Sequence, residues 1–184
     1  MVAGDENMKK DLLWIRNVNP GDAAVLSEIY RPYVEKTAVS FEYEAPDAEE
    51  FAGRIAEITK KYPYVVACLN GRIVGFAYAS VFKARAAYDG CVEVSVYVDA
   101  GFHGQGVGSF LYRVLEKRLK KMGVRHAYAC ISYPDHGEDA TLTKDSVNFH
   151  YAMGYSMCAY FKDCGYKFGR YYSMVWMEKT LRAI

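Results

Sequence analysis

The stretch that decides the fold is residues 91–109, which read CVEVSVYVDAGFHGQGVGS. Its first half places a valine at every second position: Val92, Val94, Val96 and Val98. Glu93 and the other intervening residues therefore point to the opposite side of an extended chain. This strict alternation predicts a strand with one buried face, so Glu93 is expected to be held on a rigid element.

The segment that follows, 103–108, reads HGQGVG and is expected to lead into a helix over about 107–122. Glycines let backbone N–H groups approach a ligand closely, and a helix N-terminus favours negative charge. The pattern therefore predicts a cradle for a pyrophosphate, although a tight turn between a strand and a helix would use the same glycines. Dinucleotide and P-loop motifs do not fit, because no Lys-Ser/Thr pair follows the glycines and no strand-helix-strand unit precedes them.

Hydrophobic periodicity assigns the remaining elements. Strands are expected near 12–18, 64–69, 72–82, 92–99, 126–132, 155–162 and 172–179, and helices near 24–33, 47–62, 107–122 and 146–153. Asn70-Gly71 predicts a hairpin turn between two of the strands, and Pro32 predicts that the first helix divides into two short ones. The fold class is α/β of the α+β type, with a mixed, mostly antiparallel sheet of about seven strands flanked by helices.

The length of 184 residues predicts one domain over 12–184, after a disordered segment at 1–11. The formal net charge of +1 carries no basic footprint for nucleic acid. The polar start and the absence of long apolar runs predict neither export nor a membrane anchor. Five cysteines without a CxxC pair favour a reduced, cytoplasmic setting, and the histidine spacings predict no metal site.

Several separated motifs resemble those of one family. The Val-rich strand with its glycine turn resembles the acetyl-CoA-binding motif of the GNAT superfamily of N-acetyltransferases. Further segments resemble its phosphinothricin acetyltransferase branch: Ser40–Glu42, Lys83–Tyr88, Val92–Val98 and Phe149–Tyr155. The motifs occur in the family's order between about residues 14 and 181, so the resemblance implies the GNAT acyl-CoA N-acyltransferase fold.

The resemblance implies a set of residues that bind acetyl-CoA as co-substrate. They are Val96, Tyr97, Val98, Gly104, Gln105, Gly106, Val107, Gly108, Ser109 and Thr143. Two positions depart from the family pattern. Thr143 stands where the family usually has Asn, and His103-Gly104 replaces a common Gln-Arg pair, which leaves more of the binding to backbone N–H groups.

Acetyl transfer to an amine requires a base for the amine, a donor for the oxyanion and an acid for the departing thiolate. The resemblance implies Glu93 as the general base, acting through a water, and the N–H of Val98 as the oxyanion donor. It places His150 where it could protonate the thiolate or help deprotonate the amine. The residues alone favour a solvent-facing strand residue for Glu93 and a structural helix residue for His150.

The resemblance also implies an acceptor site built from Phe41, Lys83, Arg85 and Tyr88. Lys83 and Arg85 would meet the acidic group of the acceptor, although two alternating cations near a strand end could simply be solvated. The expected partner is a small-molecule amine, and the aromatic residues between Tyr166 and Trp176 could serve a homodimer.

Three functions stay open at this point. The first is acetylation of an amino-acid-like amine of the phosphinothricin or methionine sulfoximine type. The second is acetylation of another amine, such as a protein N-terminus, a lysine or an antibiotic, because acceptor loops vary on one fold. The third is a sensor that binds acyl-CoA without catalysis, which would need the glycine cradle but neither Glu93 nor His150.

Overall fold

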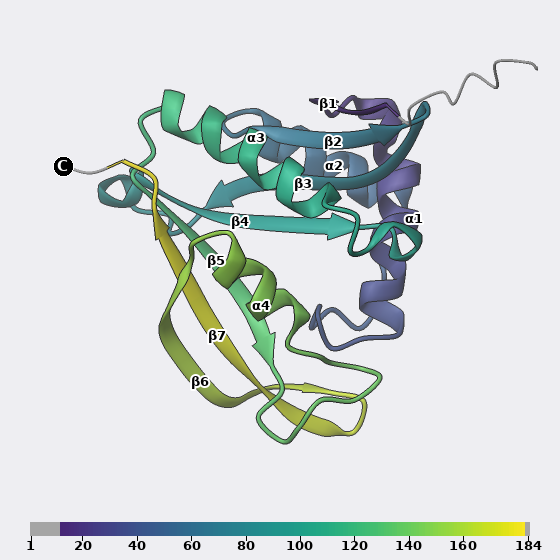
Figure 1. Ribbon diagram of the computed structural model, residues 1–184, viewed down its shortest axis with the longest axis vertical. Helices are drawn as coiled ribbons and strands as arrows, with labels where there is room; N and C mark the ends of the chain where they lie inside the picture. Colours follow the sequence, from purple (N-terminus) through teal and green to yellow (C-terminus); the bar gives the residue numbers. More distant parts are fainter. Residues whose placement is uncertain (1–11, 183–184) are drawn as a thin grey trace, which may run out of the picture.

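The computed structural model describes residues 12–182, so the predicted disorder at 1–11 lies outside the described residues. Seven strands and four α-helices follow one another in the predicted order within this part of the chain (Figure 1). They are β1 (Leu13–Asn17), α1 (Ala23–Glu35), α2 (Ala48–Thr59), β2 (Tyr64–Leu69), β3 (Arg72–Val81), β4 (Cys91–Val98), α3 (Val107–Lys121), β5 (His126–Tyr133), α4 (Asp145–Ala152), β6 (Ser156–Lys167) and β7 (Arg170–Thr180).

The strands form one sheet in the order β1-β2-β3-β4-β5-β7-β6. Every neighbouring pair is antiparallel except β4 and β5, which run parallel. The prediction of a mixed, mostly antiparallel sheet flanked by helices is therefore confirmed. The Asn70-Gly71 turn is confirmed as well, since both residues have positive φ (51° and 82°), as a tight hairpin requires.

The predicted division of the first helix at Pro32 is wrong. α1 is one helix with Pro32 inside its last turn. The proline costs a single backbone hydrogen bond there, and the buried side chains of Ile29, Tyr30 and Val34 lie on both sides of it. Tertiary packing of this apolar face outweighs the local preference.

The last two strands are longer than predicted. β6 reaches Lys167 and β7 starts at Arg170, so a hairpin closes at Phe168-Gly169, whose φ angles are 48° and 78°. Register shifts between Phe161 and Gly165 interrupt the pairing. Such bulges break the two-residue alternation on which strand prediction from sequence depends. The sequence pattern therefore predicts an end of β6 near residue 162, although the strand continues to Lys167.

The central feature of the sheet is the separation of β4 and β5. They pair only at Cys91–Glu93 with His126–Tyr128, and Figure 1 shows the two strands starting side by side and then diverging. α1 and α2 pack on β2–β4 on one face, while α3 packs on the same strands from the other face and α4 on β5. The divergence opens a gap in the middle of the sheet.

A loop that we name the strap, residues 36–47, links α1 and the β6–β7 hairpin across one end of the molecule. The buried ammonium of Lys167 donates to the carbonyls of Val34 and Ser40, both at 2.6 Å. The ring of Phe41 lies on Gly165, where an added Cβ would come within 2.3 Å of it. These contacts fasten the strap to β6.

Replacing Lys167 with Met is expected to lower the free energy of unfolding by about 3 kcal/mol, because two buried carbonyls lose their charged donor. Urea denaturation measures this change. Lys162→Met on the same strand removes an exposed ammonium and should shift stability by less than about 0.5 kcal/mol. Equal stabilities for the two variants would contradict the role of Lys167.

Candidate active site

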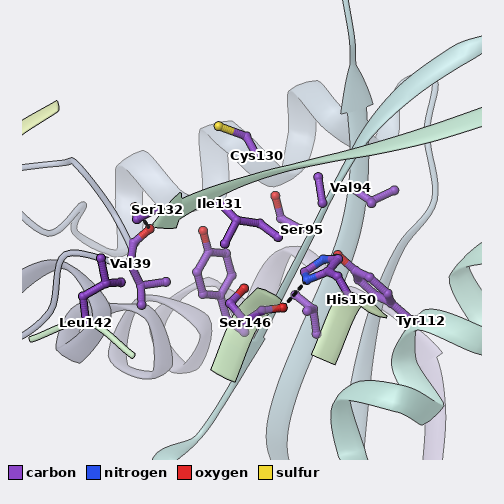
Figure 2. A pocket seen from close by; sticks show the side chains of 13 residues that line it. Val39, Val94, Ser95, Tyr112, Cys130, Ile131, Ser132, Leu142, Ser146 and His150 are labelled. Atoms are coloured by element: carbon purple, nitrogen blue, oxygen red, sulfur yellow. Dashed lines mark hydrogen bonds between the residues drawn. The ribbon is translucent and has the colours of Figure 1, made fainter. Parts of the chain in front are cut away.

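A cleft occupies the gap between β4 and β5 (Figure 2). One wall is β4 from Val94 to Tyr97 and the other is β5 from Ala129 to Ser132. Tyr112 of α3 and His150 of α4 also line the cleft. Because the cleft passes through the sheet, groups on either face of β4 can meet in it.

The backbone of β4 presents N–H groups to this cleft. The amide of Asp99 donates to the carbonyl of Val74 on β3 at 2.9 Å. Successive residues of a strand point their N–H groups to opposite edges, so Val98, Val96 and Val94 face the edge from which β5 has moved away. At Val98 the amide already donates to the hydroxyl of Tyr33 at 3.3 Å, and that hydroxyl donates to the Val98 carbonyl at 2.5 Å.

The glycine turn has the geometry of an anion cradle. Gly104 and Gly106 have φ of 72° and 80°, the left-handed region that favours glycine, and Gly106 is the N-cap residue of α3. A Cβ added to either would meet no atom within 4 Å, so open space lies beside the backbone. The fifteen-residue helix α3 begins directly after this turn, and the first N–H groups of a helix have no partner within it, so they can bind an anion.

His150 is buried and makes two hydrogen bonds. Its Nδ1 lies 2.6 Å from the carbonyl oxygen of Ser146, which can only accept, so Nδ1 carries the ring proton (Figure 2). Its Nε2 lies 3.0 Å from the hydroxyl of Tyr112 and accepts from it. Burial lowers the pKa of His150 to about 4, and the hydrogen bond to Ser146 opposes this. The ring is therefore neutral at physiological pH.

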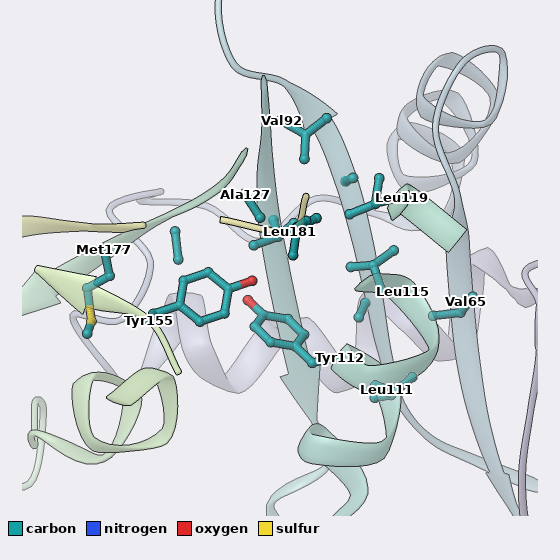
Figure 3. Packing of buried hydrophobic residues seen from close by; sticks show 14 of the residues in the cluster. Val65, Val92, Leu111, Tyr112, Leu115, Leu119, Ala127, Tyr155, Met177 and Leu181 are labelled. Atoms are coloured by element: carbon teal, nitrogen blue, oxygen red, sulfur yellow. The ribbon is translucent and has the colours of Figure 1, made fainter. Parts of the chain in front are cut away.

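Tyr112 ties α3 to α4 below the cleft. Figure 3 shows its ring between the leucines of α3 and Tyr155, whose hydroxyl points toward that of Tyr112. Burial raises the pKa of Tyr112 well above its usual value. Sequence reasoning missed this residue, because an aromatic residue inside a helical apolar stripe reads as ordinary core.

Glu93 lies on the opposite face of β4 from His150. It pairs with Ser80 on β3 and with Tyr128 on β5, at the point where the gap begins. Burial raises the pKa of Glu93, and the nearby charge of Lys83 opposes the shift. A half-buried carboxyl with a raised pKa, beside a cleft, is suited to accepting a proton near neutral pH.

The other predicted cofactor residues fall into three groups. Gln105 and Ser109 lie at the cradle, where Gln105 Nε2 donates to the Gly101 carbonyl at 3.0 Å. Val107 is part of the core, and Gly108 allows close packing, since an added Cβ would lie 3.3 Å from the Phe149 ring. Tyr97 lines the cleft but packs its ring against Tyr30 and Tyr33 of α1.

Thr143 is exposed just before α4, and its hydroxyl accepts from the Asp145 amide at 3.3 Å. It therefore lies beside the helix start without lining the cleft.

The predicted acceptor residues do not form one cluster. Lys83 and Tyr88 lie around Phe82 at the end of β3, and Arg85 is an exposed residue between them. Phe41 instead packs between Gly165 and Tyr172, at the other end of the strap contact. The structure thus brings Lys83, Tyr88 and Glu93 to one side and leaves Phe41 with the hairpin.

Within residues 12–182 no group of three or more His, Cys, Asp or Glu side chains is arranged to hold a metal ion. The four helices of this range include none that is long and apolar enough to cross a membrane.

Comparison with protein families gives a match to the acetyltransferase (GNAT) domain over residues 15–176. Phosphinothricin N-acetyltransferase of Streptomyces viridochromogenes is 32% identical over 165 residues, which cover 90% of this chain and 86% of that protein. An L-methionine sulfoximine/L-methionine sulfone acetyltransferase of Salmonella typhimurium is 27% identical over 168 residues, covering 91% and 94%.

Among solved structures, a GNAT superfamily phosphinothricin acetyltransferase of Sinorhizobium meliloti, in complex with acetyl-CoA, superimposes with a TM-score of 0.83. It is 32% identical, and the match covers 91% of this chain and 88% of that one. Sequence and structure comparisons thus agree over nearly the same part of the chain.

The neutral state of His150 predicts a dependence of stability on pH. The folded pKa of about 4 lies below the ordinary 6.5, so the unfolded chain binds an extra proton between these values. The free energy of unfolding is then complete above about pH 6.5 and falls as the pH drops toward 4, by an amount on the order of 3 kcal/mol. Urea denaturation at pH 7 and pH 4.5 measures the loss.

His150→Gln should remove most of this pH dependence, whereas His136→Gln, which removes an exposed imidazole, should keep it. The same pH dependence in wild type and in His150→Gln would show that His150 is not the group responsible.

Proposed function

Because this chain belongs to the GNAT family and is an acetyl-CoA-dependent N-acetyltransferase, we propose that it acetylates the primary amine of a small amino-acid-like molecule. The observation that carries the proposal is the cleft between β4 and β5, with Glu93 at the point where the two strands separate and the glycine turn following β4 in the chain. The named substrates of the two relatives, phosphinothricin and methionine sulfoximine or sulfone, support this acceptor class.

The proposed binding of acetyl-CoA uses mostly backbone groups. Its pyrophosphate would lie against the N–H groups of Gly104, Gly106 and the first turn of α3, where the helix dipole favours negative charge. Its pantetheine arm would follow the edge of β4 that faces the cleft. The donor supplies an activated acetyl group as a thioester.

For the oxyanion we propose the N–H of Val96. Val98, which the resemblance implies, faces the same edge, but its amide already donates to Tyr33. Val96 presents its N–H to the same cleft two residues earlier, nearer the wall formed by β5. A fixed backbone donor stabilises the developing negative charge without reorganisation.

For proton transfer we propose Glu93 as the general base. The amine nitrogen attacks the thioester carbonyl, a C–N bond forms, the C–S bond breaks, and the amine proton passes through water to the Glu93 carboxylate. The raised pKa of Glu93 makes it able to return that proton to the departing thiolate. A neutral His150 has no proton at Nε2 to give, so its geometry favours holding the Tyr112 hydroxyl in the cleft.

The homodimer and the cytoplasmic location stay predictions. Acetylation of other amines stays the second candidate.

Glu93→Gln is expected to lower kcat/KM for the amine by about 100- to 10,000-fold, because the general base is lost. Acetyl-CoA should still raise the Tm of the variant as it does for wild type. Release of free CoA thiol measures turnover, and Glu57→Gln, which changes an exposed glutamate of α2, serves as a control that should retain activity. Turnover of Glu93→Gln within a few-fold of wild type would exclude Glu93 as the base.

In wild type, log kcat/KM should be low at acid pH and should rise as the pH increases through the raised pKa of Glu93, because only the ionised carboxylate accepts a proton. This limb should be absent from the residual activity of Glu93→Gln.

Gly106→Ala tests the cradle. A residue with a Cβ is strained at φ of 80°, by about 1–2 kcal/mol, so the first N–H groups of α3 should turn away from the ligand. We expect the Kd for acetyl-CoA to rise about tenfold while kcat at saturation changes little. Isothermal titration calorimetry measures this Kd.

Gly53→Ala inside α2, where an added Cβ meets nothing within 4 Å, is the matched control. It should leave acetyl-CoA binding unchanged and stabilise the fold by about 0.5–1 kcal/mol. Equal Kd values for Gly106→Ala and wild type would place the pyrophosphate elsewhere.

A further inference from the structure

Three aromatic rings gather on the face of the sheet that carries Glu93. Phe82 stacks on Tyr128 with 4.4 Å between ring centroids and meets Trp176 edge to face at 5.5 Å. Tyr128 and Trp176 lie 6.4 Å apart. The rings come from the end of β3, from β5 and from β7, and each is only partly buried. We name them the ring cluster.

Strand register places the ring cluster on the same face of the sheet as the proposed base. Glu93 pairs with Ser80 on one side and with Tyr128 on the other. Side chains two residues apart on a strand share a face, so Phe82 lies on the same face as Ser80. Trp176 pairs with Cys130, two residues after Tyr128, and shares that face too. Tyr128 is therefore the cross-strand neighbour of Glu93, and Phe82 and Trp176 join it on the same face through their ring contacts with Tyr128.

This face is open to solvent beside the rings. α1 and α2 pack on β2, β3 and β4, and Cys130, the cross-strand partner of Trp176, is exposed. Tyr88 extends the cluster at its edge, with its ring 6.1 Å from that of Phe82 and 39% exposed. A small molecule can thus reach the rings from the side on which Glu93 lies.

Charged side chains of both signs lie around the ring cluster. The ammonium of Lys83 lies 5.3 Å from the Phe82 centroid and 5.9 Å from that of Trp176. The carboxylates are Glu93 and Glu178, the latter being the cross-strand partner of Tyr128 on β7. A zwitterionic amino acid matches this arrangement, with its amine at Glu93 and its carboxylate at Lys83. Two carboxylates beside the rings disfavour an acidic side chain.

We propose that Phe82, Tyr128 and Trp176 form the side-chain subsite of the acceptor and select α-amino acids with aromatic or thioether side chains over acidic ones. This rests on the proposed function, whose acceptor it narrows. Ring faces bind flat apolar groups by offset stacking and bind sulfur by polarisable contact. The amine and the carboxylate of the acceptor would bind at Glu93 and Lys83.

The kinetic test compares phenylalanine, methionine, glutamate and glycine as acceptors at saturating acetyl-CoA. Wild type should show the lowest KM for phenylalanine and methionine. Trp176→Ala should raise both of these KM values about tenfold. Trp176→Phe, which keeps an aromatic ring, should have KM values close to those of wild type. The KM for glycine, which has no side chain, and the Kd for acetyl-CoA should stay unchanged in both variants.

Trp14→Ala is the matched control, because Trp14 is the second tryptophan of the chain and lies exposed on β1. It should leave all four KM values as in wild type. A wild-type preference for glutamate, or an equal rise of KM for glycine and phenylalanine in Trp176→Ala, would overturn the subsite.

Binding without turnover separates this inference from the proposed function. In Trp14→Phe, Trp176 is the single tryptophan, and its fluorescence should change saturably on addition of phenylalanine or methionine but not of glutamate. Such a change in the absence of any acetyl transfer would support the ring cluster and refute the proposed reaction. Acetyl transfer to amino acids with no change in Trp176 fluorescence would refute the ring cluster alone.

Discussion

The structure depends on one interruption of the sheet, the divergence of β4 and β5 after three paired residues. A continuous sheet would pair the N–H groups of Val94, Val96 and Val98 with a neighbouring strand. Because β5 turns away, the N–H groups of Val94 and Val96 face a cleft and can bind an extended ligand in place of a strand, while that of Val98 donates to the Tyr33 hydroxyl. The cleft also lets side chains from both faces of the sheet approach one reacting centre.

Such a gap removes hydrogen bonds from the middle of the sheet, and other contacts hold its two halves together. Tyr112 and His150 join α3 to α4 below the cleft. The ammonium of Lys179 on β7 binds the carboxylate of Glu116 on α3 at 2.7 Å and the carbonyl of Met153 at 2.6 Å. Lys167 fastens the strap on the remaining side. Glu116 and Lys167 are buried, and buried charged groups with such partners favour one arrangement of the two halves.

The division of labour between the two faces of β4 follows from its alternation. The even-numbered valines pack against α3 and their N–H groups face the cleft, so this side suits the acetyl donor. The odd-numbered positions put Glu93 on the other face, beside open aromatic side chains. Donor and acceptor can therefore enter from opposite faces and meet where the strands separate, which is the geometry that direct transfer between two bound molecules requires.

Patterns that are local in the chain could be predicted from the sequence alone. The alternation of 92–98 predicts β4 with Glu93 on the face opposite the valines, Asn70-Gly71 predicts the hairpin, and the glycines at 104 and 106 predict the turn that leads into α3. These features depend on the conformational preferences of a few adjacent residues. Periodicity also predicts the order of the elements, and the family motifs added the expectation of an acetyl-CoA-dependent N-acetyltransferase, which the comparisons confirm.

What the tertiary structure decided depends on residues far apart in the sequence. Packing kept α1 intact through Pro32, and bulges in β6 hid the true length of the last hairpin. The neutral state of His150 follows from its burial against Tyr112, 38 residues away. The ring cluster exists because sheet register brings β3, β5 and β7 together. A pKa or a binding surface depends on spatial neighbours, and periodicity along the chain does not specify them.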